Sequence, residues 1–447
     1  MLIKKRLAHF SPGRLILLSF LFTVFIGTIL LALPISRTQP ISLIDLLFTS
    51  TSATCVTGMI IVPLENFTTF GHCVLIGLMQ IGGLGLVTMT LFFMSLFVNL
   101  GLTTQIMAGQ LLEIEAWQNI KKIIAFIIIT TLTIETVGTL VTYTSIYTYY
   151  DSTFEAILFS IFHAVSSFCN VGLSPFKNSM ELFTHNPKML ISTIVLVFCG
   201  GFGFVTWYEL ILYLKSIRKK RRYTFSLHSK ITLYVTTILL TIATLSFFIL
   251  EHNNAFLKLS KPMAFLNSLF IVVASRSTGL LTVNIGTLHL GSILLIMIIA
   301  FIGSSPGSTG SGIKTTALAV FFATIKSGIL GKTSINLKGR KIAKDQIYKT
   351  IAIVSLSFLW ILFSCFCLLI TEQGWHFIDI LFESVSAFTT IGLTTGLTHH
   401  LSYIGKIFII LSMFIGRIGS LTLLLALRKT KKEKTDFSYP EERLMLS

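Results

Sequence analysis

Residues 43–58 read LIDLLFTSTSATCVTG, and the same pattern returns three more times along the chain. Each copy has an apolar segment, then a short polar run, then a glycine. The later copies are FEAILFSIFHAVSSFCNVG (154–172), MAFLNSLFIVVASRSTG (263–279) and FIDILFESVSAFTTIG (377–392). Their closing glycines are 114, 107 and 113 residues apart, and this regularity indicates one structural unit written four times.

Long apolar stretches bracket every copy. They precede the copies at about 15–34, 123–148, 231–250 and 348–370, and follow them at about 71–98, 188–213, 290–326 and 403–428. Each is long enough to cross roughly 30 Å of hydrocarbon as a helix, whereas the repeated segment itself is too short. The sequence therefore predicts an all-α integral membrane protein with eight transmembrane helices and four re-entrant pore helices, arranged with pseudo-symmetry around one central pore.

Composition and charge agree with a membrane protein. Hydrophobic residues make up 53% of the chain, charged residues 12%, and the mean hydropathy is +0.83, whereas a soluble domain has about 25% charged residues. The net charge is +17, but 26 of the 35 Lys and Arg residues fall on one side when alternate loops are assigned to opposite sides. Positive charge marks the cytoplasmic side. We therefore expect a multi-pass protein of a bacterial plasma membrane, with both termini cytoplasmic and no nucleic-acid partner.

The repeats set the predicted boundaries. Repeat 1 covers 1–99, repeat 2 covers 100–222, repeat 3 covers 223–335 and repeat 4 covers 336–428, and a cytoplasmic tail follows at 429–447. The predicted filter loops are 54–58, 168–172, 275–279 and 388–392. The six cysteines have no metal-ligand spacing with histidine, so we expect no cofactor and no transition-metal site.

The four glycine loops have the composition of an ion filter. A pore must replace the water of a dehydrated cation by fixed oxygen ligands, and stacked backbone carbonyls suit K⁺. Glycine allows the unusual dihedral angles that this needs, and the small or β-branched residues before it are expected to be extended. The predicted ion-binding residues are Val56, Thr57, Gly58, Asn170, Val171, Gly172, Ser277, Thr278, Gly279, Thr390, Ile391 and Gly392. The alternative is that these are ordinary glycine helix ends beside loops.

A second polar stretch, GSSPGSTGSG at 303–312, interrupts the last apolar segment of repeat 3. Such residues do not continue a helix stably. The stretch nearly matches a phosphate-binding loop, but Ile313 stands where that motif needs lysine, so we reject nucleotide binding. We predict a gating loop at 303–314 below the filter, or else a kink between packed helices. The predicted gate residues are Gly303, Gly307, Ser308, Thr309, Gly310, Gly312, Lys314 and the membrane-depth Arg417.

These stretches, with SATCVTG, FHAVSSFCNVG, SRSTG, FTTIGLTTGLT and FIGRIGSLT as the most specific, resemble the membrane subunit of the Trk/Ktr/HKT potassium transporter superfamily, with the Ktr branch fitting best. The resemblance covers nearly the whole chain. It implies that the four loops form a K⁺ filter, that Gly58 favours K⁺, and that Arg417 stands just below the filter. Cys55 and Cys169 depart from the family pattern, in which threonine and a polar amide are common.

The resemblance also implies a homodimer on a cytosolic nucleotide-binding regulatory ring of the RCK type. The expected function is potassium uptake through the filter, controlled by the gating loop and that partner, with Na⁺ as a possible activator or coupling ion. The alternative is a self-sufficient monovalent cation channel, or a Na⁺-coupled symporter, without a regulatory partner. The chain has no HExxH motif and no nucleophile–base spacing, so it is not expected to be an enzyme.

Overall fold

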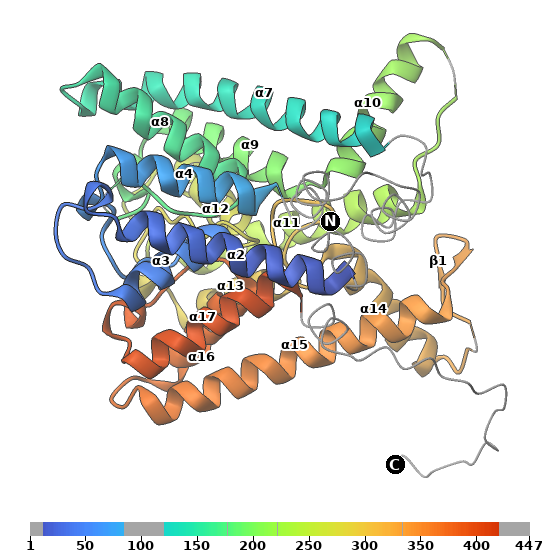
Figure 1. Ribbon diagram of the computed structural model, residues 1–447. Coiled ribbons are helices and arrows are strands. Elements are labelled where there is room, and N and C mark those ends of the chain that lie inside the picture. Colours follow the sequence, from blue (N-terminus) through green and yellow to red (C-terminus); the bar gives the residue numbers. More distant parts are fainter. Residues whose placement is uncertain (1–11, 85–119, 177, 221, 333, 420–447) are drawn as a thin grey trace, which may run out of the picture.

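The computed structural model describes residues 12–84 and 120–419, apart from positions 177, 221 and 333, and this part is built almost entirely of helices (Figure 1). The one described sheet is a hairpin of β1 (Asn336–Leu337) and β2 (Arg340–Lys341), which pair antiparallel with Asn336 opposite Lys341. The helices are α2 (Pro12–Ala32), α3 (Leu43–Thr54), α4 (Thr69–Gly83), α7 (Ile120–Ile146), α8 (Thr153–Phe168), α9 (Pro187–Gly201), α10 (Phe204–Arg218), α11 (Leu227–Glu251), α12 (Lys261–Ala274), α13 (Leu290–Ile302), α14 (Thr315–Ile329), α15 (Lys344–Thr371), α16 (Phe377–Thr389) and α17 (Tyr403–Ile418).

Among the described residues, α7, α11 and α15 contain helices that are long and apolar enough to cross a bilayer. The bent pair of α9 and α10 adds a fourth if it counts as one span. Their outward faces carry large apolar side chains, among them Leu132, Ile242 and Phe366, each more than half exposed. Apolar faces of this kind, on helices long enough to cross a bilayer, indicate contact with lipid. The chain is thus a helical, multi-pass membrane protein. The count of eight spans stays a prediction, and 85–98, 420–428 and the tail lie outside the described residues.

The predicted span at 188–213 is wrong in one respect, because the helix breaks in the middle. α9 ends at Gly201 and α10 begins at Phe204, and their axes differ by 100°. Gly203 between them has φ +91°, which lies outside the helical region and is readily adopted only by glycine. In Figure 1, α10 accordingly leaves the direction that α9 and α7 share.

Two of the predicted repeats share a capping device that supports their common origin. Glu251, the last residue of α11, accepts a hydrogen bond from the backbone N–H of His289, which precedes α13, at 3.0 Å. Glu372, just after α15, likewise accepts from the backbone N–H and the hydroxyl of Ser402, which precedes α17. In both repeats a carboxylate therefore satisfies a helix N-terminus, where free N–H groups attract negative charge.

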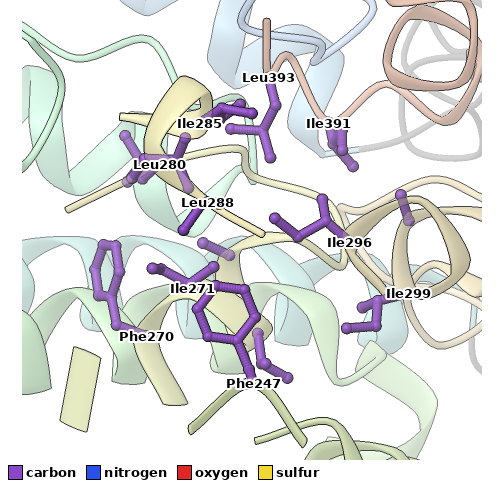
Figure 2. Close-up of a cluster of buried hydrophobic side chains, with 14 of the residues drawn as sticks. Phe247, Phe270, Ile271, Leu280, Ile285, Leu288, Ile296, Ile299, Ile391 and Leu393 are labelled. Atoms are coloured by element: carbon purple, nitrogen blue, oxygen red, sulfur yellow. The ribbon is translucent and has the colours of Figure 1, made fainter. Parts of the chain in front are cut away.

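The four short helices α3, α8, α12 and α16 carry the repeated motifs and lie in the interior. The C-terminal halves of all four are buried. One large apolar cluster joins α11, α12 and α13 to the loop after α16, and in Figure 2 Leu393 of that loop lies next to Ile285. The cluster thus holds the third and fourth predicted filter loops against each other.

Candidate functional site: four loops and an intramembrane segment

The four motif glycines form a closed ring of contacts with their neighbours' backbones. Gly58, Gly172, Gly279 and Gly392 all have positive φ, at +83°, +84°, +69° and +79°. A Cβ atom at each would overlap the carbonyl oxygen of one residue in the next repeat. These residues are, in the order of the glycines, Val171, Thr278, Ile391 and Thr57. The last contact returns to repeat 1, so the four loops surround one axis, and any side chain at these positions would collide with backbone.

Three of the loops begin with the same turn. Val56, Asn170 and Thr390 have left-handed φ values of 59°, 60° and 52°. The following residue in each loop, such as Thr57, donates its N–H to a carbonyl five residues earlier, for example to Ser52 at 2.8 Å. This is the Schellman arrangement that closes a helix C-terminus. The prediction of extended residues before the glycines is therefore wrong at these three positions, because the chain reverses there.

Left-handed backbone is unusual for a β-branched residue and costs about 1–3 kcal/mol, so it persists only where the surroundings impose it. Val56 and Thr390 are both fully buried. Strain of this kind gathers at functional sites, and its presence in two loops of one ring makes the ring the candidate functional site.

The third loop is built differently. Ser275 to Thr278 follow α12 as continuous turns, and the N–H groups of Thr278 and Gly279 both bond the carbonyl of Ala274. Arg276 donates its Nε–H to the carbonyl of Gly303, at the end of α13, at 3.3 Å. The guanidinium is buried, and its Nη2 has no hydrogen-bond partner among the described residues.

Serine hydroxyls fasten the same three loops behind the ring. Ser52 donates to the carbonyl of Met59 at 2.8 Å, Ser166 to that of Leu173 at 2.7 Å and Ser386 to that of Leu393 at 2.6 Å. Each bond joins the short helix to the residue just past the glycine. Val273 occupies the matching position in repeat 3 and offers no hydroxyl.

Glycines also bring the following helices against the short helices. A Cβ at Gly82 of α4, Gly200 of α9 or Gly416 of α17 would overlap the carbonyl oxygen of Thr54, Phe168 or Phe388 respectively. Each carbonyl belongs to the last two residues of the preceding short helix. Close packing therefore explains Gly82 and Gly200, and also Gly83, whose Cβ would lie 2.4 Å from the side chain of Cys169, as helix interfaces in membranes favour small residues. A Cβ at Gly201 would meet nothing closer than 3.7 Å.

The segment between α13 and α14 is an irregular loop that folds on itself. Gly303, Gly307 and Gly312 have positive φ, and so does Lys314 at 85°. The N–H of Ser304 bonds the carbonyl of Ser311 at 3.1 Å, which closes the loop, and Lys314 Nζ donates to the carbonyl of Gly310 at 2.5 Å. Ser308 lies inside the loop, where its hydroxyl donates to the carbonyl of Ser305.

This loop is attached to repeat 2. The N–H groups of Thr309 and Ser305 donate to the carbonyls of Gly200 and Gly201, both at 3.1 Å. The N–H of Phe204 donates in turn to the carbonyl of Gly307 at 2.8 Å. The break between α9 and α10 thus leaves backbone groups free, and the loop satisfies them.

Arg417 joins the loop to two other repeats. Its Nη1 donates to the carbonyl of Thr309 at 2.6 Å and to the hydroxyl of Ser311 at 3.0 Å, and its Nη2 donates to the carbonyl of Gly82. The side chain is buried. A planar guanidinium can bond several acceptors at once, and a lysine cannot do so in the same geometry.

Two buried carboxylates, Glu383 and Glu135, lie near the ring at positions that the sequence did not predict. Glu383 of α16 accepts a hydrogen bond from Thr398, in the 3₁₀ turn Leu397–His400. Glu135 of α7 lies 3.7 Å from Sγ of Cys169, the residue that opens the second loop. A glutamate at membrane depth indicates a functional or hydrogen-bonded site. The partners of Glu383 and Glu135 could not be predicted, because no local sequence pattern reveals contacts with distant residues.

Comparison with known proteins agrees with this arrangement. The family described as "TrkH: Cation transport protein" matches residues 15–438, and the chain belongs to that family. The resemblance to the Trk/Ktr/HKT superfamily is thereby confirmed, and a family of transport proteins is consistent with a chain that is not an enzyme.

Two relatives and one solved structure illustrate the match. "Ktr system potassium uptake protein B" of Bacillus subtilis (strain 168) is 35% identical over 438 residues, 97% of this chain and 96% of that protein. "Potassium/sodium uptake protein NtpJ" of Enterococcus hirae is 31% identical, over 99% of this chain and 98% of that protein. The crystal structure of the potassium transporter TrkH from Vibrio parahaemolyticus has the same fold, with a TM-score of 0.68 at 19% identity, covering 92% of this chain and 84% of the other.

Proposed function

We propose that this chain takes up K⁺ across the plasma membrane through the ring of four loops, and that the loop at 303–314 gates the path. The closed ring of glycine contacts is the observation that carries the proposal. It brings the carbonyls of four loops to one axis, where they can replace the water of a K⁺ ion. The names of the Ktr relatives, which are potassium uptake proteins, support the choice of ion.

Within this proposal the residues have separate roles. The backbone of Val56–Gly58, Asn170–Gly172, Ser277–Gly279 and Thr390–Gly392 binds the ion, and α3, α8, α12 and α16 are re-entrant pore helices between eight spans. Their C-terminal ends point toward the ring and contribute partial negative charge for a cation. The loop obstructs the path beside the filter, because it contacts the second and third filter loops.

Arg417 holds this loop in the closed arrangement, since its donors bond the loop at Thr309 and Ser311 while also bonding α4 at Gly82. Release of those bonds would free the loop to move. We further propose that the chain works as a homodimer on a cytosolic nucleotide-binding ring that controls this step, with both termini on the cytoplasmic side.

Sodium is a second candidate for transport or coupling. The name of the Enterococcus relative, a potassium/sodium uptake protein, favours it. A Na⁺-coupled symporter and a channel for K⁺ differ in whether K⁺ uptake depends on external Na⁺. Uptake that stays the same when choline replaces Na⁺ excludes the coupled alternative.

The proposal is tested by potassium uptake in a bacterium that lacks its own uptake systems. Wild type should restore growth at low K⁺, and deletion of Gly307–Ser311 should leak. Gly58→Ser should lose the preference for K⁺ and admit Na⁺, because its Cβ would force the first loop away from the carbonyl of Val171. Gly77→Ser is the matched control, because Gly77 has open space around its Cβ position. A well-expressed wild type that moves no K⁺, even with a cognate cytosolic ring present, would overturn the potassium reading.

A further inference from the structure

The side chain of Asn170 connects three separate parts of the candidate site. Its Oδ1 accepts a hydrogen bond from the hydroxyl of Thr278, in the third loop, at 2.6 Å. Its Nδ2 donates to the hydroxyl of Thr309, in the intramembrane loop, at 2.6 Å. Asn170, Thr278 and Thr309 are all fully buried. One amide thus uses both of its ends to tie two loops of the ring to the segment beside them.

The surroundings leave this amide little freedom. The hydroxyl of Thr309 donates onward to the carbonyl of Phe168 at 3.0 Å, and Asn170 Nδ2 lies 3.3 Å from the same oxygen. A Cβ added at Gly200 would come within 2.7 Å of Asn170 Nδ2 and 2.8 Å of Thr309 Oγ1. The lack of a side chain at Gly200 therefore allows α9 to pack closely against Asn170 and Thr309. The amide of Asn170 cannot rotate without losing hydrogen bonds that buried polar groups need.

The matching positions in the first and fourth loops do not make this connection. Val56 and Thr390 stand two residues before their glycines, as Asn170 does, and share its left-handed backbone. Val56 has no polar atom in its side chain, and the hydroxyl of Thr390 has no partner among the described residues. Asparagine tolerates the left-handed conformation better than either. Asn170 of repeat 2 therefore both tolerates the left-handed turn and bonds Thr309 of the intramembrane loop.

From this we infer that Asn170 is a positioning residue that couples the intramembrane loop to the filter, so that the position of the loop changes the ion preference of the ring as well as opening the path. The inference rests on the proposed function, because it assumes that the four loops select the ion. A shift of Thr309 pulls on Nδ2, and the same amide holds Thr278, whose carbonyl lies against Gly172. Loop movement is thereby passed to two adjacent walls of the ring.

The experiment measures K⁺ flux and the preference for K⁺ over Na⁺ in liposomes that contain the full chain. Thr309→Val keeps the shape of the side chain but removes the hydroxyl, and should lower that preference about tenfold, as expected for one lost buried hydrogen bond. Thr309→Ser keeps a hydroxyl and should restore the preference. Thr315→Val is the control, since the buried hydroxyl of Thr315 has no partner among the described residues.

A double-mutant cycle then identifies the route. In an Asn170→Ala background, Thr309→Val should cause a much smaller loss of preference, because the connection through Asn170 is already cut and only the bond to the carbonyl of Phe168 remains to be lost. If Thr309→Val lowers the preference by the same factor in both backgrounds, or alters flux alone, the coupling through Asn170 is refuted. If the Thr309→Val protein does not fold, Thr278→Val tests the other bond by the same readout. A wild type without K⁺ flux, even when a cognate cytosolic ring is added, refutes the proposed function instead.

Discussion

Lys406 and Asp45 form an ion pair at 2.6 Å that joins the first turn of α17 to the first turn of α3. Both side chains are largely buried, with exposed fractions of 16% and 18%. The hydroxyl of Ser42 donates to the other carboxylate oxygen at 2.6 Å. The pair therefore closes the molecule between its fourth and first repeats at the start of a candidate pore helix.

Breaking this pair should destabilise the protein measurably. Lys406→Met leaves a mostly buried carboxylate without its cation, and we expect the free energy of unfolding to fall by about 2 kcal/mol, between the values for exposed and for buried pairs. The measurement is denaturant-induced unfolding in detergent. Lys349→Met is the control, because its pair with Asp345 is 59% and 66% exposed and should contribute under about 1 kcal/mol. Equal effects of the two substitutions would contradict the prediction.

Gly172→Ala should abolish transport. The new Cβ would overlap the carbonyl oxygen of Thr278 and would also require a left-handed alanine. Neither problem arises in Gly77→Ala, where the Cβ meets open space within a helix, and helix propensity alone should stabilise that variant by about 0.5–1 kcal/mol. Ion flux and thermal unfolding of both purified proteins would check this. Normal flux through Gly172→Ala would refute the tight ring.

Ser386→Ala should weaken the fourth loop. The substitution removes the bond to the carbonyl of Leu393 and leaves that buried acceptor unsatisfied, which costs about 1–3 kcal/mol. Thermal unfolding should show a lower midpoint, and K⁺ flux should fall with it. Ser292→Ala offers a comparison, since its buried hydroxyl has no partner among the described residues and its loss should change the midpoint little. The reasoning fails if both variants unfold alike.

Arg417→Lys should leak despite keeping the charge. Lysine cannot reach the carbonyls of Thr309 and Gly82 together in the geometry of the guanidinium, so the loop should be held by fewer bonds. The expected result is a raised basal K⁺ flux in liposomes, at least several-fold, without any partner protein. A variant that stays closed would show that charge alone, and not the shape of the donor, holds the loop.

Much of the fold could be predicted because the same motif, with the same flanking apolar stretches, occurs four times in the sequence. The motif glycines were found from sequence, and all four have the positive φ that glycine was expected to supply. The polar stretch 303–314 was expected to interrupt a helix and does so between α13 and α14. Periodicity and composition carry such information because they reflect the backbone and the solvent, which are local constraints.

The remaining features depend on contacts between distant residues. The break at Gly203 falls in the run Gly200-Gly201-Phe202-Gly203, whose glycines permit it, but the bond from the N–H of Phe204 to the carbonyl of Gly307 that supports it joins residues distant in sequence. The turns at Val56 and Thr390 contradict the preference of β-branched residues, and only the surrounding ring imposes them. The roles assigned to the filter and gate residues stay predictions, which the experiments above address.

The third loop differs from the other three in its turn and in the contact that Arg276 makes, so the ring is asymmetric in a way that four identical subunits could not be. Since each loop has its own codons in a single chain, a mutation can change one loop and leave the other three as they are. Val273 has no hydroxyl to clamp the loop, and Arg276 bonds the intramembrane loop, so repeat 3 has a link to that loop where the other repeats have the serine bond. Because all four loops belong to one chain, one quarter of the ring can differ in structure from the rest.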